Sequence, residues 1–141
     1  MKRIGRILFA LYALLMLWLL FGQRIGQDGG GINLIPFATA ADFLRLLAEG
    51  QNMHHAVINL AGNVVMFVPL GLLLPLCSAS LRRFGRCMAV CAACIVCVEL
   101  MQLITRLGVC DVDDLILNLF GAAAGYGIYR ALFRKRAENK E

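Results

Sequence analysis

Long apolar segments alternate with shorter polar ones along the whole chain. The apolar segments cover about residues 7–21, 57–77, 87–103 and 115–133. Their lengths are near the ~20 residues with which an α-helix crosses the hydrocarbon core of a bilayer. Because a backbone in lipid must satisfy its own hydrogen bonds, the pattern predicts an all-α integral membrane bundle of four transmembrane helices. We expect one domain over residues 1–141.

The longest polar stretch, residues 22–55, separates the first two predicted spans. It opens with a glycine-rich run and continues into TAADFLRLLAEG at residues 39–50. Apolar residues recur there at near-helical spacing, with Thr39 as a candidate N-cap and Gly50 as a stop signal. This segment is therefore predicted to form a short interfacial helix in the first outer loop.

Polar side chains interrupt the spans at positions that share helix faces. In the second span, Asn59 and Asn63 are four residues apart and lie on one face. A charge at the centre of a span costs roughly 2.5 to 3.5 kcal/mol on insertion scales, so ionisable side chains here need a partner or a cavity. With one residue of the first loop added, the candidates for lining a ligand cleft are Asn33, Asn59, Asn63, Glu99, Gln102, Arg106, Asp111, Asp114 and Asn118.

Three of the predicted spans place polar groups at the same depth. At ~1.5 Å of rise per residue, Asn63, Glu99 and Asn118 each lie within roughly 10 Å of the outer surface. This holds although the second and fourth spans run inward and the third runs outward. We therefore expect these side chains to meet at the outer end of the bundle, where the acids of residues 111–114 face Arg106.

Simpler structural roles account for the same residues. Asn59 and Asn63 are typical of the polar contacts that hold transmembrane helices together, at about 0.6 kcal/mol each. The acids at 111–114 suit the N-cap of the fourth helix, where carboxylates meet the positive end of the helix dipole. Three acids exceed what one cap needs. A buried Glu99 requires a proton or an ion pair, and Arg106 is its expected partner.

Composition and charge agree with a membrane protein. The 141 residues are 60% apolar and only 16% charged, with a net charge of +5. The basic residues cluster beside apolar segments and form no stripe among aromatic residues, which excludes a nucleic-acid partner. The clusters lie before the first span, between the second and third, and after the fourth. Since basic loops stay in the cytoplasm, both termini are predicted to be cytoplasmic.

No residue pattern predicts a metal, a cofactor or a catalytic group. Three of the six cysteines, within residues 91–97, have CxxC spacing, but no second pair or histidine cluster completes a metal site. His54 and His55 adjoin the second span and are best explained as lipid headgroup contacts.

Four separated motifs follow one another between residues 33 and 126. They are Asn33-Leu-Ile-Pro36-Phe37, then Gly62-Asn63 with Phe67-Val-Pro69-Leu-Gly71, then Glu99-Leu-Met-Gln102, then Asp111-Val-Asp-Asp114-Leu-Ile-Leu-Asn118-Leu-Phe-Gly121 with Gly125-Tyr126. Together they resemble the VanZ-like family of small bacterial membrane proteins. Leu119 departs from the Thr that many relatives carry, a change that concerns local helix packing. The resemblance implies a bacterial cell membrane, a link to low-level teicoplanin resistance, and neither a cofactor nor a catalytic residue.

Three functions fit these observations. In the first, which we favour, the outward polar cleft binds an amphiphile such as a lipid-linked cell-wall precursor or a glycopeptide, and so changes antibiotic susceptibility. In the second, the chain is a non-catalytic assembly subunit, and Gly121 and Gly125 form its contact with a partner helix or a second copy. In the third, the acids at 111–114 hold Mg²⁺ in an intramembrane enzyme that acts on a lipid diphosphate. Membrane lipids surround the chain in all three.

Overall fold

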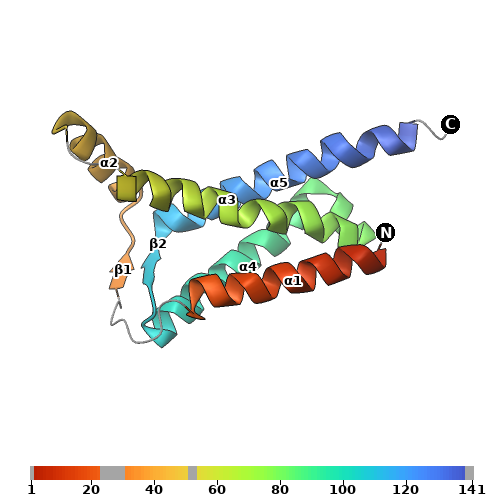
Figure 1. Ribbon diagram of the computed structural model, residues 1–141, viewed down its shortest axis with the longest axis horizontal. Coiled ribbons are helices and arrows are strands. Elements are labelled where there is room, and N and C mark those ends of the chain that lie inside the picture. Colours follow the sequence, from red (N-terminus) through yellow and green to blue (C-terminus); the bar gives the residue numbers. More distant parts are fainter. Residues whose placement is uncertain (1, 23–30, 51–53, 139–141) are drawn as a thin grey trace.

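The computed structural model describes residues 2–22, 31–50 and 54–138, and most of these lie in helices (Figure 1). The elements in chain order are α1 (Lys2–Leu20), β1 (Gly31–Asn33), α2 (Ala38–Ala48), α3 (His54–Cys77), the 3-10 helix η2 (Ala79–Arg82), α4 (Phe84–Thr105), β2 (Val109–Asp111) and α5 (Val112–Glu138). Among the described residues, four helices are long and apolar enough to cross a membrane, by length and composition only. The predicted all-α bundle is confirmed.

The centre of the bundle is the crossing of α3 and α5, where the two backbones touch. A Cβ atom added to Gly71 would lie 1.8 Å from the carbonyl oxygen of Ala122. One added to Gly125 would lie 1.9 Å from the carbonyl oxygen of Val68. Helices in membranes approach this closely only where small residues remove the side chains between them.

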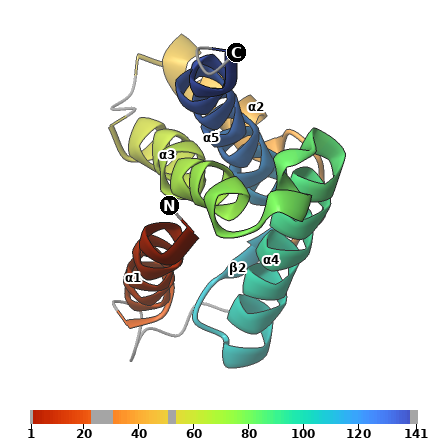
Figure 2. The ribbon, with the colours of Figure 1, turned by 90° about the vertical axis from the view of Figure 1, so that its right-hand side faces the viewer.

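The other two long helices pack on this central pair (Figure 2). α1 contacts α3, and α4 contacts α5. The Tyr12 hydroxyl donates a 3.0 Å hydrogen bond to the Met66 carbonyl oxygen and so joins α1 to α3. At the other side of the bundle, the Tyr126 hydroxyl donates to the Arg82 carbonyl oxygen over 2.6 Å, which joins α5 to η2. The buried core between the helices includes Ile95, Ala122, Phe67, Leu70, Leu74, Cys87 and Cys91.

The two ends of the bundle differ in character. The N- and C-terminal ends of the chain lie at one end, together with the connection between α3 and α4 (Figure 1). β1, β2 and α2 lie at the other end, where α3 and α5 begin (Figure 1). We call this second end the polar end, because the polar side chains described below gather there.

A two-stranded parallel sheet at the polar end was missed by the sequence analysis. β1 pairs with β2 so that Gly31 lies opposite Val109 and Asn33 lies opposite Asp111. Strands of three residues are too short to show an alternating pattern, and both lie in stretches that were interpreted as loops. The pairing ties the first loop to the connection between α4 and α5.

α2 confirms that the first loop contains a short helix, but its start differs from the prediction. The helix begins at Ala38, so Thr39 lies inside it and is not the N-cap. Gly50 follows the helix with a φ of 64°. Glycine adopts this left-handed conformation at no steric cost, which explains why the helix stops here. The interfacial position of α2 stays a prediction.

Candidate functional site

Asp111 caps α5 and also joins the two strands. Its Oδ1 atom accepts a 2.8 Å hydrogen bond from the backbone N–H of Asp113, the second residue of the helix. This is the N-cap interaction that the sequence predicted. Its Oδ2 atom accepts a 3.1 Å hydrogen bond from the side-chain amide of Asn33. The Asn33 Oδ1 atom in turn accepts from the backbone N–H of Ile35 over 3.2 Å.

The second acid of the motif fixes the start of α2. The Asp113 Oδ1 atom accepts a 2.6 Å hydrogen bond from the backbone N–H of Phe37, which has a φ of 65°. Only 5% of Asp113 is exposed. Asp113 was absent from the predicted site residues, because a one-turn cap explains an acid there without any distant contact. The sequence did give one sign of a further role, because three acids are more than a single N-cap needs.

The third acid joins α5 to α3. Asn63 donates a hydrogen bond from its side-chain amide to Asp114 Oδ1. The three acids therefore bind three different segments: β1, the start of α2, and α3. This explains why three carboxylates stand at the beginning of one apolar helix. Two of these contacts join residues that the sequence analysis named as cleft candidates, Asn33 with Asp111 and Asn63 with Asp114. The predicted meeting of Asn63, Glu99 and Asn118 in one ligand cleft stays a prediction.

Further polar side chains of α4 and α5 lie buried. Glu99 is 6% exposed, Gln102 is 5% exposed and Asn118 is 3% exposed. In the described part of the chain, the Asn118 Oδ1 atom has no hydrogen-bond partner. A buried acceptor without a partner costs roughly 1–3 kcal/mol. The burial of Asn118 therefore lowers the stability of the folded protein.

A cavity of about 160 Å³ opens beside Glu99. We call it the Glu99 cavity. It lies between α4 and the start of α5, beneath the strand β2, and is lined by Leu34, Val96, Glu99, Leu100, Cys110, Asp111, Val112 and Leu115. The exposed walls of the cavity are almost entirely apolar, although Glu99 and Asp111 are among the lining residues. The two oxygen atoms of Asp111 already accept hydrogen bonds from Asn33 and Asp113, so Glu99 is the candidate polar contact in this cavity.

Cys110, on β2, lines this cavity, and the pKa of its thiol is affected by the acidic residues nearby. Burial makes the largest contribution to raising the pKa of its thiol above the ordinary value. The negative charges of Glu99 and then of Asp111 raise this pKa further. Negative charge disfavours the thiolate, since the thiolate would add another negative charge at the same place. The thiol was not a predicted site residue, because a lone cysteine in a predicted loop carries no signal in the sequence.

Arg106, one of the predicted site residues, does not join these buried polar side chains. The Arg106 side chain is exposed, and its backbone, with a φ of 56°, caps the end of α4 by donating to the Leu103 carbonyl oxygen. Arg106 follows the last residue of α4, so it does not share the buried helix face of Glu99 on which their predicted ion pair was based. That ion pair stays a prediction. Asn59 lies in α3, but its side chain lies outside what the structure describes.

The glycine face of α5 is occupied within the chain. A Cβ atom added to Gly121 would lie 2.1 Å from the Val64 carbonyl oxygen of α3, and Gly125 meets the same helix. The contact surface that was predicted for a partner helix is therefore covered by α3. Contacts with other chains through another surface stay a prediction.

The donor set for a metal ion is not found in residues 2–22, 31–50 and 54–138. No group of three or more His, Cys, Asp or Glu side chains there could hold a metal ion. The acids of the motif instead accept hydrogen bonds from Asn33, Phe37 and Asn63. These contacts give no support to the hypothesis that the acids at 111–114 hold Mg²⁺ in an enzyme.

Comparison with known proteins identifies the family. A model of the VanZ/LLP1 family matches residues 8–134, which is nearly the whole chain. This range includes the whole of α3 and α4, most of α1 and α5, and the elements of the polar end. No significant match is found among curated proteins or solved structures.

Proposed function

Because the chain belongs to the VanZ/LLP1 family, we propose that it binds an amphiphilic ligand, either a lipid-linked cell-wall precursor or a glycopeptide, at its polar end and thereby protects a bacterial cell against teicoplanin-type glycopeptides. The family and the four apolar helices make it a membrane-embedded protein. Beyond membership of the family and the membrane, we propose the ligand, its binding site and the effect on antibiotic susceptibility.

The observation that carries the proposal is the Glu99 cavity. Its volume is about 160 Å³, its exposed walls are almost entirely apolar, and the nearly buried Glu99 is among its lining residues. An amphiphile needs this combination, because its apolar part leaves water for the walls while its polar group requires a hydrogen-bonding partner. The hydrogen bonds of Asp111 fix β2, which contributes Cys110 and Asp111 to the lining of the cavity.

Charge at the opposite end supports an orientation with the cavity on the outer face. Arg82 and Arg83, in the connection between α3 and α4, and Arg86, in the first turn of α4, are exposed at the end where both termini lie (Figure 1). Basic loops remain in the cytoplasm, so this orientation puts the termini inside the cell and the polar end outside. Glycopeptides and the head groups of exported cell-wall precursors are present on that outer face.

The experiment is a deletion and complementation assay for teicoplanin susceptibility. Wild type, Glu99→Gln and Asp42→Asn are expressed at equal membrane levels, checked by immunoblot. The first substitution replaces the carboxyl group at the cavity with an amide of nearly the same size. The second removes a charge from an exposed position on α2 and serves as the matched control.

We expect wild type and Asp42→Asn to restore protection and Glu99→Gln to lose it. Asp114→Asn is also expected to lose it, because this residue fixes α3 at the polar end. Full protection by Glu99→Gln would remove the cavity as the ligand site. Protection lost by Asp42→Asn as well would show that the assay reports overall charge.

A further inference from the structure

A groove between α1 and α4 is separate from the site described above. It has a volume of about 230 Å³ and shares no lining residue with the Glu99 cavity. We propose that this groove binds the acyl chain of an anionic phospholipid, whose head group lies beside Arg6. The proposal does not depend on the proposed function, because it concerns other residues and another ligand.

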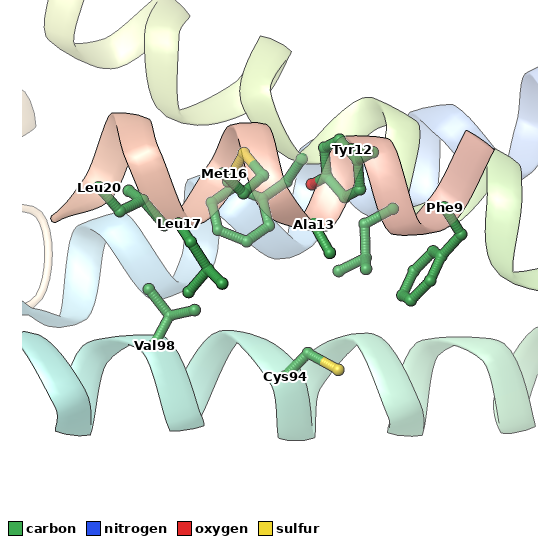
Figure 3. Close-up of a pocket in the computed structure, with 10 residues that line it drawn as sticks. Phe9, Tyr12, Ala13, Met16, Leu17, Leu20, Cys94 and Val98 are labelled. Atoms are coloured by element: carbon green, nitrogen blue, oxygen red, sulfur yellow. The ribbon is translucent and has the colours of Figure 1, made fainter. Parts of the chain in front are cut away.

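The groove lies beside α4 because the described residues of α1 are fastened to α3. Tyr12 holds α1 through its hydrogen bond to the Met66 carbonyl oxygen. Nearer the N-terminus, Gly5 lets α1 approach α3 so closely that an added Cβ atom would lie 3.0 Å from the Leu76 Cβ atom. α1 and α4 run alongside each other, and side chains of both helices point into the space between them (Figure 3).

The walls of the groove are apolar along their whole length. Phe9, Ala13 and Leu17 come from α1, whereas Cys94 and Val98 come from α4 (Figure 3). The hydroxyl group of Tyr12, which also lines the groove, already donates to the backbone of α3. The groove therefore offers few hydrogen-bonding partners to a polar ligand. An apolar ligand gives up no hydrogen bonds when it enters.

The shape and position of the groove fit an acyl chain. Its lining residues on α1 extend from Phe9 to Leu20, which are eleven residues apart. At a helix rise of about 1.5 Å per residue, the groove is about 17 Å long. Both helices are long and apolar enough to cross a membrane, so the groove lies at the depth of the hydrocarbon core. Leu17 is 50% exposed, which shows that the groove opens to the surroundings. At this depth the surroundings are lipid chains.

A basic residue stands at one end of this groove and selects the head group. Arg6 lies one turn before Phe9, and its spacing of seven from Ala13 and eleven from Leu17 puts it on the same face of α1. Its side chain is exposed. A basic side chain at the membrane surface attracts anionic lipids, so a phospholipid whose chain fills the groove is expected to carry negative charge.

The experiment is photocrosslinking of the full-length protein in nanodiscs. The probes are phosphatidylglycerol and phosphatidylcholine that carry a diazirine in the middle of one acyl chain, and the labelled residues are mapped by mass spectrometry. We expect phosphatidylglycerol to label Leu17, Cys94 and Val98. Ala13→Trp, which fills the groove, should lower this labelling several-fold, whereas Ala10→Trp, on an exposed position of the same helix, should not.

The charge is tested with a second pair of variants. Arg6→Gln should lower the preference for phosphatidylglycerol about five-fold, as expected for one basic side chain near the membrane surface. Arg130→Gln, an exposed arginine on α5, should leave the preference unchanged. If Ala13→Trp fails to insert, Val98→Trp fills the groove from the opposite wall.

Three results would overturn the proposal. The first is labelling that concentrates on Leu8, Leu11 and Leu15, the exposed side of α1, and ignores Ala13→Trp. The second is equal groove labelling by the two lipids. The third is a groove that resists labelling while a variant with Cys94 as its sole cysteine forms a covalent dimer on oxidation, since a second copy would then occupy it.

Discussion

Asn63 donates its side-chain amide to the carboxylate of Asp114, and this hydrogen bond joins α3 to α5 at the polar end. Asn63→Ala should destabilise the protein by about 1–2 kcal/mol. This lies between the average polar contact of transmembrane helices and a hydrogen bond to a charged group. The exchange Asn63→Asp with Asp114→Asn restores a donor and an acceptor and should recover at least half of the loss.

The free energy of unfolding, measured by steric trapping in bicelles, checks this prediction. A double-mutant cycle of the two positions isolates their coupling. Additive effects of the two single substitutions would contradict a direct contact.

Gly125→Ala should be among the most damaging small substitutions in the chain. An added Cβ atom would lie 1.9 Å from the Val68 carbonyl oxygen, so the two helix backbones must move apart. Overpacking of this kind costs about 1–3 kcal/mol. Gly127→Ala, two residues away in the same helix, meets nothing within 4 Å and should be neutral or slightly stabilising. Equal losses in the two variants, measured by the same unfolding assay, would argue against the close crossing.

Cys110 should react slowly with maleimide at neutral pH, in a variant that keeps it as the sole cysteine. Its thiol pKa is raised by burial and by the charges of Glu99 and Asp111, so the reactive thiolate is scarcer than in a free cysteine. Glu99→Gln removes one of these charges, lowers the pKa and should shift the profile of labelling rate against pH toward lower pH. Asp42→Asn is the control. An unchanged profile in Glu99→Gln would mean that the Glu99 charge does not act on Cys110.

Asn118→Leu separates stability from function. The buried Asn118 Oδ1 atom has no hydrogen-bond partner in the described residues, so an apolar side chain of similar size should keep or raise the free energy of unfolding. If the polar end binds a ligand, the same variant should lose protection against teicoplanin. A variant that loses stability and protection together would show that Asn118 serves packing alone.

The sequence predicted the helices well because each long apolar segment carries its own signal. The polar end was predicted in part: spacing along α5 indicated the cap at Asp111, and the common depth of Asn63 and Asn118 placed both at one end. The strands and the role of Asp113 could not be predicted, because they depend on contacts between residues about 76–78 positions apart. Arg106 was misplaced, since helical spacing was extended past the residue at which α4 ends.

The central claim is that the Glu99 cavity takes an amphiphile, and the most direct measurement is native mass spectrometry of the purified protein titrated with teicoplanin. A glycopeptide that lacks the acyl tail serves as the comparison. The account predicts that wild type and Asp42→Asn bind teicoplanin in preference to the tail-less compound, and that Glu99→Gln loses this binding. Equal binding by wild type and Glu99→Gln, or no preference for the acylated compound, would contradict it.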